Sequence, residues 1–184
     1  KFCFYSHLVY PNLKKNFYGI SVESVKIENS LNYLGIPSGA KKELFIPLWI
    51  KSNIEYVKRF LRGFFDTDGS VFCQRNYSIK NNLYHTQIRI ALVSISENLM
   101  LEIKNLISTL NIKSLVRVRK AKPNADGYNR QDSYVVSICG GIQVNKWFKN
   151  IGSMNPKHIT KYQIWKKFGF CPPFTKLETR KKIL

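Results

Sequence analysis

The sequence has no long apolar run, few cysteines and histidines, and few acidic residues. No stretch approaches the 18 or so apolar residues that a membrane-spanning helix needs, which argues against an integral membrane protein. The chain has 184 residues, and its hydrophobic content of 44% is ordinary, so it can form one good domain core or two small ones. We therefore expect a folded globular protein rather than a disordered one.

Cysteine motifs for metal binding are also missing. Cys3, Cys73, Cys139 and Cys171 lie far apart without a CxxC pair, and only three histidines accompany them. This spacing disfavours a zinc site and favours buried free thiols in a reducing compartment. No signal peptide is visible, so we expect an intracellular, cytoplasmic protein. The first residue, Lys1, is not methionine, which leaves open a longer gene product.

Negative charge is scarce. The sequence has 11 aspartates and glutamates against 30 lysines and arginines, and its formal net charge is +19 at pH 7. Solubility does not require such an excess, so the natural partner is a polyanion. A membrane surface is the competing partner, but the basic residues are spread through predicted strands and loops. We therefore favour nucleic acid.

One stretch, Lys51–Val71 (KSNIEYVKRFLRGFFDTDGSV), carries acidic residues at an unfavourable place. Ser52 and Glu55 form a capping-box pattern that predicts a helix start. Asp66 and Asp68 fall in or just past the last turn, where the helix dipole disfavours each carboxylate by about 0.3–1 kcal/mol. A divalent metal ion or a basic cluster would compensate this charge. One predicted apolar face runs along the helix, formed by Ile54, Val57, Phe60, Leu61, Phe64 and Phe65.

Two glycines mark this helix and its end. Gly63 lies mid-helix, where glycine costs about 1 kcal/mol relative to alanine, so we expect another backbone to approach it closely. Gly69 permits the sharp turn into the strand that follows. A DTDG turn taken alone is more often a solvated turn or a fragment of a calcium loop than a catalytic centre.

The joint pattern changes this interpretation. Leu61–Gly69 (LRGFFDTDG) resembles the LAGLIDADG motif of homing endonucleases position by position, with Arg62 for the small second residue and Thr67 at the seventh position. The preceding Ile46–Ile50 and Leu34–Gly39 also look like the approach to this motif in the archaeal and intein-type (DOD) branch of the family. The resemblance covers the chain from about Leu34 to the C-terminus.

Periodicity predicts an α+β order of elements, αββαββα, within a domain of residues 51–184. After the motif helix, the predicted elements are strands Ser70–Tyr77 and Thr86–Ile95, a helix from Ser96 to Leu110, strands Leu115–Lys120 and Ser133–Cys139, and helices Gly141–Ile151 and Asn155–Phe168. Asn155 with Pro156 is a helix-start signal, and a basic tail through Arg180–Lys182 is expected. The resemblance alone implies that the strands form a four-stranded antiparallel, saddle-shaped sheet with helices on one face.

Residues 1–50 form a separate N-terminal segment in this interpretation. We expect a strand, a turn near Pro11-Asn12, and a helix Ser21–Leu34 that ends at Gly35 in the left-handed conformation. Asn111-Ile112 follows the helix from Ser96 in the same way that Gly35-Ile36 follows Leu34. The segment is therefore a candidate remnant of a first repeat, and a chance coincidence is the alternative.

The predicted sheet carries polar side chains on the face away from the core. Arginine and glutamine suit both base edges and phosphates, so this face is predicted to bind DNA. A solvated sheet face is the alternative for any single residue, but the net charge favours DNA contact for the set. The predicted DNA-binding residues are Gln74, Arg75, Asn76, Lys80, Gln87, Arg89, Arg117, Arg119, Lys120, Lys122 and Arg130.

The resemblance implies a sequence-specific, Mg²⁺-dependent endonuclease of double-stranded DNA that acts as a homodimer or as half of a two-motif monomer. Asp68 is the implied catalytic residue and metal ligand, and the Thr67 carbonyl is a further candidate ligand. Asp66 is predicted to be structural. Gly63 and Phe64 are predicted to lie at the interface with a second motif helix, which would bring two Asp68 side chains together.

One position departs from the family pattern. Relatives often have a lysine soon after the strand that ends at Cys139, and Gly141 stands near that place. Lys120 or Lys122 is a candidate substitute.

Two other functions compete with the endonuclease. One is a nucleic-acid-binding relative without cleavage, either an RNA-splicing maturase or an inactive DNA-binding remnant. The other is a structural basic protein on ribosomal RNA. The intact DTDG sequence argues against the ribosomal protein and mildly against the non-cleaving relative.

Overall fold

The structure is a computed structural model that describes residues 6–12, 17–22, 24–36, 43–75, 84–121 and 131–184. The chain divides into two compact units, Lys1–Gly39 and Ala40–Leu184. None of the described helices is both long and apolar enough to cross a bilayer.

The first unit contains a hairpin and a helix. Strands β1 (Ser6–Asn12) and β2 (Phe17–Val22) pair antiparallel, and α1 (Val25–Tyr33) follows. The predicted helix start at Ser21 is wrong, because β2 extends to Val22 and the side chain of Ser24 caps α1. Gly35 adopts the predicted left-handed conformation, with φ of 79°.

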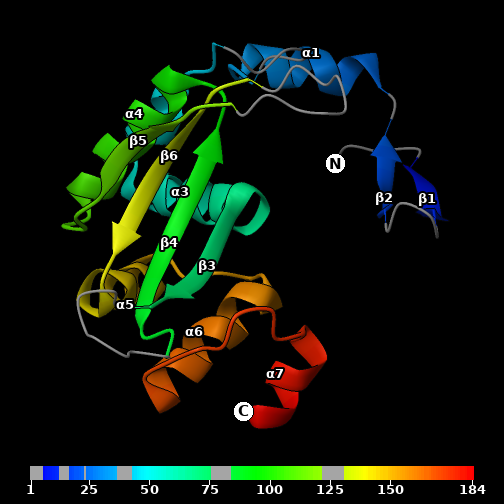
Figure 1. The fold of residues 1–184 in the computed structure, drawn as a ribbon. Helices are drawn as coiled ribbons and strands as arrows, with labels where there is room; N and C mark the ends of the chain where they lie inside the picture. The colour runs from blue at the N-terminus through cyan, green and yellow to red at the C-terminus, as the bar shows by residue number, and fades with distance from the viewer. Residues whose placement is uncertain (1–5, 13–16, 23, 37–42, 76–83, 122–130) are drawn as a thin grey trace. The chain divides into compact units, whose positions relative to one another are not determined.

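The second unit has the predicted αββαββα order (Figure 1). Its elements are α2 (Leu48–Lys51), α3 (Ile54–Asp68), β3 (Gly69–Gln74), β4 (Gln87–Ser94), α4 (Glu97–Thr109), β5 (Leu115–Arg119), β6 (Ser133–Cys139), α5 (Gly141–Asn150), α6 (Pro156–Phe168) and α7 (Leu177–Ile183). The four strands form one antiparallel sheet in the order β3-β4-β6-β5. Helices α3, α4 and α5 pack against one face of it, so the predicted fold class is confirmed.

The core lies between that face and the helices. Phe65 on α3 is fully buried and meets the ring of Trp147 on α5 edge-on, with centroids 5.2 Å apart. The predicted apolar face of α3 is only partly covered, because Ile54 is 48% exposed and Phe60 and Phe64 are half-buried. The described second unit therefore leaves apolar surface on its motif helix.

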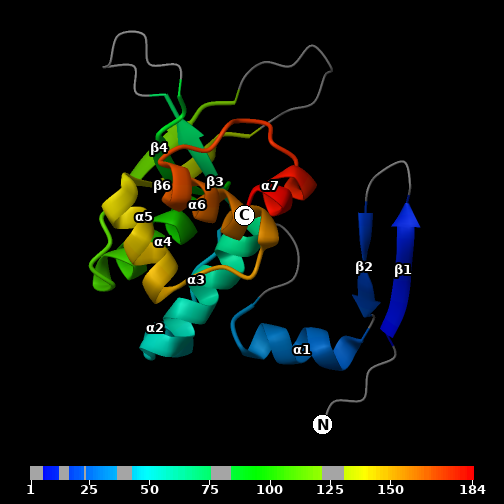
Figure 2. The ribbon, with the colours of Figure 1, turned by 90° about the horizontal axis from the view of Figure 1, so that it is seen from below.

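The predicted capping box at the start of this helix is wrong. The Oδ1 atom of Asn53 accepts the cap hydrogen bond from the amide of Glu55, at 2.8 Å. Ser52 instead ends the short helix α2, where its hydroxyl donates to the carbonyl of Trp49. Figure 2 shows α2 leading directly into α3. Ser52 is thus the C-cap of α2, and Asn53 is the N-cap of α3.

Two predicted boundaries also differ from the structure. Strand β3 ends at Gln74 rather than Tyr77, and Arg75 lies outside it. Part of the predicted basic tail is helical, because residues Leu177–Ile183 form helix α7. This helix packs against α6, and α6 in turn packs against β3. Arg180, which the sequence places in a charged tail, is 4% exposed because it faces α6.

Candidate functional site

The end of α3 presents one exposed carboxylate. Asp68 is the last residue of the helix, and its side chain is exposed. The Thr67 hydroxyl lies 3.0 Å from Oδ2 of Asp68 and 3.1 Å from the carbonyl oxygen of Gly63, so its proton can be donated to either. No salt bridge joins Asp68 to a basic side chain within the described part of the chain. The predicted electrostatic conflict at this helix end is therefore present.

Asp66, two residues earlier, has a different environment. Its carboxylate accepts hydrogen bonds from the Ser153 hydroxyl and from the amide of Met154, the latter at 2.8 Å. Its carbonyl accepts a bond from Nδ2 of Asn155, at 3.0 Å. These contacts fix the end of the motif helix to the segment that enters α6. Asp66 is therefore a structural carboxylate.

Gly69 sets the position of Asp68 relative to the sheet. A Cβ atom at residue 69 would lie 2.4 Å from both the carbonyl oxygen and a ring carbon of Phe65. The backbone here is extended, so glycine is required by this close approach rather than by a left-handed turn. Strand β3 begins at once, which places the carboxylate at the start of an edge strand.

The centre of the outward face of α3 is Gly63. A Cβ atom there would have no heavy atom within 4 Å. Tyr56, two helical turns earlier, is 46% exposed, and the rings of Phe60 and Phe64 stack beside the glycine with centroids 6.3 Å apart. Nothing in the described part of this chain therefore requires a glycine at 63.

The residues at the helix end match part of a magnesium site. Magnesium prefers hard oxygen ligands and keeps several waters, so one or two carboxylates suffice when a substrate phosphate is also present. Asp68 offers one such oxygen donor, open to solvent. Within the described ranges, no group of three or more histidine, cysteine, aspartate or glutamate side chains is placed to hold a metal ion. The donor set thus fits half of a site that a second carboxylate would complete.

Register places several predicted DNA-binding residues on one face of the sheet. Directly paired residues of an antiparallel ladder share a face, and Arg89 pairs with Phe72 and Cys139 while its neighbours Ile88 and Ile90 are buried. None of the described strand residues on the face away from the helices is acidic. The predicted residues that this face carries are Gln74, Gln87, Arg89, Arg117 and Arg119.

The other predicted DNA-binding residues lie elsewhere. Arg75 follows β3, and its Nε donates to Nε2 of His85 at 3.3 Å. Lys120 is exposed and forms a salt bridge of 2.7 Å with Asp132. Asn76, Lys80, Lys122 and Arg130 lie outside the described residues.

The structure explains why no lysine stands at position 141. A Cβ atom there would lie 2.6 Å from the Cη2 atom of the Trp165 ring, and a hydrogen bond from Nε1 to the carbonyl of Thr86 holds that ring. The candidate substitute Lys120 follows β5, the opposite edge strand from β3. Three strand spacings, about 14 Å, separate these edges, so the structure does not bring Lys120 to Asp68.

Two basic groups near this edge were not predicted. His158 on α6 is buried beside Phe65, and its Nδ1 lies 3.8 Å from Oδ1 of Asp66. Burial lowers the pKa of His158, although the Asp66 carboxylate opposes that shift. Lys161 donates from Nζ to the carbonyl of Val71 at 2.9 Å and so covers the free edge of β3. No sequence motif indicates either residue, because the contacts between α6 and β3 join residues that are far apart in the sequence.

Comparison with known proteins identifies the family of the domain that contains the motif helix and the sheet. A search of curated proteins returns no match to the chain. The family model described as "LAGLIDADG-like domain" matches residues 55–152, which span α3, the four strands, α4 and α5. This match covers more than half of the chain and includes the motif helix, the sheet and Asp68. The chain therefore belongs to the family of LAGLIDADG-like domains.

Proposed function

We propose that this chain is a metal-dependent endonuclease that cleaves double-stranded DNA at a specific sequence. The observation that carries the proposal is the exposed Asp68 carboxylate, which has no basic partner among the described residues although its helix dipole disfavours it. A fold gains nothing from such a charge, whereas a magnesium ion beside a phosphodiester would use it.

Each group has a distinct role in this proposal. Bound Mg²⁺ would stabilise charge on the phosphate and make a water molecule more nucleophilic. Asp68 would hold the ion, with the Thr67 carbonyl as a further ligand, and the Thr67 hydroxyl would orient Oδ2 of Asp68 by donating to it. The arginines and glutamines of the outer sheet face would contact phosphates and base edges.

Cleavage of both strands requires a second copy of the motif. The open surface above Gly63, flanked by Phe60 and Phe64, suits close packing of another motif helix. The twin helix would come from a second copy of this chain or from a first motif in the same polypeptide. Packing through Gly63 would place a second Asp68-type carboxylate beside the first and complete the oxygen donor set.

A non-cleaving, nucleic-acid-binding relative is the second candidate. One observation favours it: Gly141 packs against Trp165, so the lysine often found near this place in the family has no room. Such a protein would keep the basic sheet face and would not depend on Asp68. The branch within the family and an intracellular location also remain predictions.

A randomised duplex library distinguishes the two candidates. We expect the wild-type protein to cleave a subset of sequences when Mg²⁺ is added and to stop when EDTA removes it. Asp68→Asn should abolish cleavage and leave duplex affinity nearly unchanged. Glu55→Gln is the matched control, because it removes an exposed carboxylate from the other end of the same helix. Selection of bound sequences without cleavage by the wild type would instead support the non-cleaving relative.

A further inference from the structure

A cationic pocket lies at the outer edge of β3. It has a volume of about 540 Å³, opens to solvent and is lined by residues of β3, α6, α7 and the segment between these two helices. The side chains that matter here are Phe72, Cys73, Lys157, Lys161, Cys171 and Arg180. No aspartate or glutamate lines it. The endonuclease proposal uses none of these cations.

Arg180 is the buried charge of this pocket. Its side chain belongs to a residue that is only 4% exposed. Its Nε donates to Oγ1 of Thr160 at 3.0 Å, and its Nη1 donates to the carbonyl of Thr175. Both acceptors are neutral, and no salt bridge of the described residues involves this guanidinium. A buried charge without a counter-charge is unfavourable, so an anion would stabilise this arrangement.

Two lysines add to the positive charge of the pocket. Lys161 is half-buried and donates to the backbone of β3, and Lys157 lies one turn earlier on α6 with an exposed side chain. Burial lowers the pKa of Lys161, and the charges of Arg180 and Lys157 lower it further. Arginine and lysine together are the usual ligands of phosphate oxygens.

The nearest ionisable partners are two thiols. A hydrogen bond from Cys73 lowers the pKa of Cys171 to about 7, and the positive charges of Arg180 and Lys161 act in the same direction. The positive charges around the pocket thus favour the thiolate form of Cys171. An anion that enters the pocket would compete with this thiolate, which makes Cys171 a reporter of occupancy.

We propose that this pocket binds a phosphate group between Arg180, Lys157 and Lys161. Phe72 lines the pocket and also belongs to the outer face of the sheet, where it pairs with Arg89. The pocket therefore adjoins the face that we propose for DNA. The phosphate has two sources, the backbone of a bound duplex or a free phosphate ion, and only the first rests on the proposed function.

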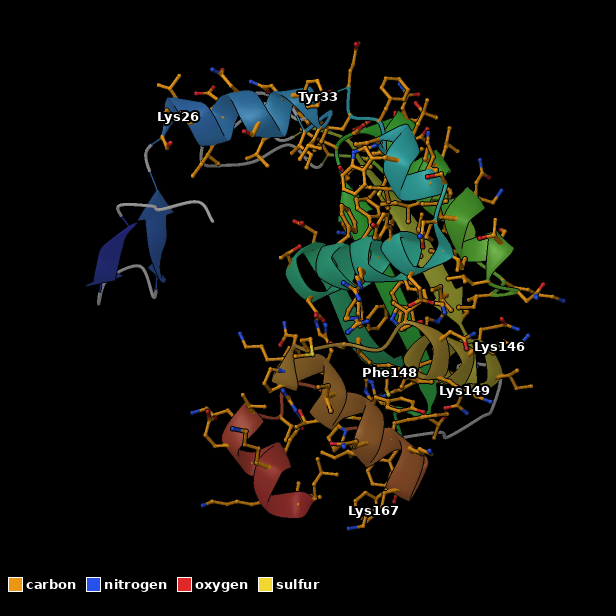
Figure 3. The ribbon with its side chains drawn as sticks, turned by 180° about the vertical axis from the view of Figure 1, so that it is seen from behind. Lys26, Tyr33, Lys146, Phe148, Lys149 and Lys167 are labelled. Atoms are coloured by element: carbon orange, nitrogen blue, oxygen red, sulfur yellow. The ribbon has the colours of Figure 1, made fainter. Side chains whose placement is uncertain are left out.

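The first experiment uses inorganic phosphate and the free protein under reducing conditions. We expect phosphate to slow alkylation of Cys171 by iodoacetamide several-fold relative to chloride at equal ionic strength, while alkylation of Cys139 is unchanged. Mass spectrometry of peptides reports both thiols at once. Lys157→Gln should remove most of this protection. Lys149→Gln is the matched control, because Lys149 is an exposed lysine on α5 (Figure 3) that does not line the pocket, and it should keep the protection.

The second experiment identifies the source of the phosphate. If a duplex supplies it, Lys157→Gln should reduce the slope of log affinity against log salt by about 0.9, while Lys149→Gln keeps the wild-type slope. An unchanged slope with intact phosphate protection assigns the site to free phosphate. The proposal is overturned if phosphate protects Cys171 equally in wild type and Lys157→Gln, or if phosphate gives no protection and the slope is unchanged. Neither readout requires DNA cleavage, so failure of the nuclease proposal is seen separately.

Discussion

At the scale of residues, two aspartates in one motif have opposite environments. Asp66 accepts bonds from Ser153 and Met154, whereas the side chain of Asp68 is hydrogen-bonded, among the residues that the structure describes, only to the neighbouring Thr67. The sequence places both aspartates where the helix dipole disfavours a carboxylate. The structure shows that hydrogen bonds compensate the charge of Asp66 and not that of Asp68. The partners of Asp66 lie 87 or more positions away, so local sequence could not reveal them.

The structural role of Asp66 gives a stability prediction. Asp66→Ala leaves the Ser153 hydroxyl and the Met154 amide without their acceptor, which should lower the free energy of unfolding by about 1–3 kcal/mol. Denaturant unfolding followed by circular dichroism measures this change. A loss no larger than that of the exposed control Glu178→Ala would show that these contacts do not hold α6 to the motif helix.

His158 gives a pH prediction. Burial lowers its pKa in the folded state below the ordinary value of 6.5, so the unfolded state binds the proton more readily. Stability from neutral His158 is present above about pH 6.5 and is lost as the pH falls below that value. The charged groups that face it are Asp66, Lys157 and Lys161.

The test compares wild type with His158→Phe. We expect the wild type to lose unfolding free energy relative to the variant as the pH falls from about 7.5 to 5.5. A difference that does not change with pH would mean that His158 binds its proton equally well in both states.

At the scale of elements, no packing contact within the described second unit requires a glycine at position 63 of α3. No atom of the described chain occupies the space beside it, so Gly63→Ala should raise the unfolding free energy of the unpaired chain by up to about 1 kcal/mol. The same methyl group should weaken pairing with a second motif helix. Denaturant unfolding at low protein concentration and solution mass at increasing concentration measure the two effects.

Two outcomes would contradict that account. Destabilisation of the unpaired chain would place Gly63 against its own fold. Unchanged solution mass and unchanged double-strand cleavage in Gly63→Ala would remove it from any interface. Arg62→Ala is not a suitable control, because its Nε is a buried donor, whereas Arg59→Ala tests an exposed position on the same helix.

Periodicity predicted the helices and strands of the second unit well because each buries one face. The same rule failed where short elements meet. Asn53 rather than Ser52 caps α3 because Ser52 is the C-cap of α2. Helix α7 was not predicted, because its residues were assigned to a basic tail. The burial of Arg180 depends on a contact with Thr160 on another helix, which periodicity does not encode.

The two helices with similar ends support the proposed repeat at the local level. Ser24 and Ser96 each accept a bond from the amide three residues later. Gly35 and Asn111 both have positive φ, and the following Ile36 and Ile112 donate to a carbonyl five residues earlier. Each helix also follows an antiparallel strand pair. A first-repeat remnant remains a prediction, and these shared caps are what favours it.

At the scale of the whole molecule, the described outer face of the sheet carries positive charge without acidic residues. The outer face carries three arginines and no described acidic strand residue, and the predicted residues on this face could be grouped from alternation alone. The pocket beside β3 could not, since Lys161 contacts β3, and Arg180 contacts α6, through residues distant in sequence.

Arg89 tests how this face is used. If it contacts a base, Arg89→Ala should cost about 1–3 kcal/mol of affinity for the preferred sequence and relax selectivity at one position. Lys149→Ala should leave selectivity unchanged. Binding selection with both variants measures these effects. A uniform loss across all sequences would show that Arg89 contacts phosphate only.

The most direct test of the central claim is the unfolding free energy of Asp68→Asn in EDTA and without DNA. If Asp68 serves chemistry rather than the fold, removing its charge from the helix end should stabilise the protein by about 0.3–1 kcal/mol. A clear loss of stability would show that Asp68 holds the structure together, and would contradict its assignment as the metal-binding carboxylate of a nuclease.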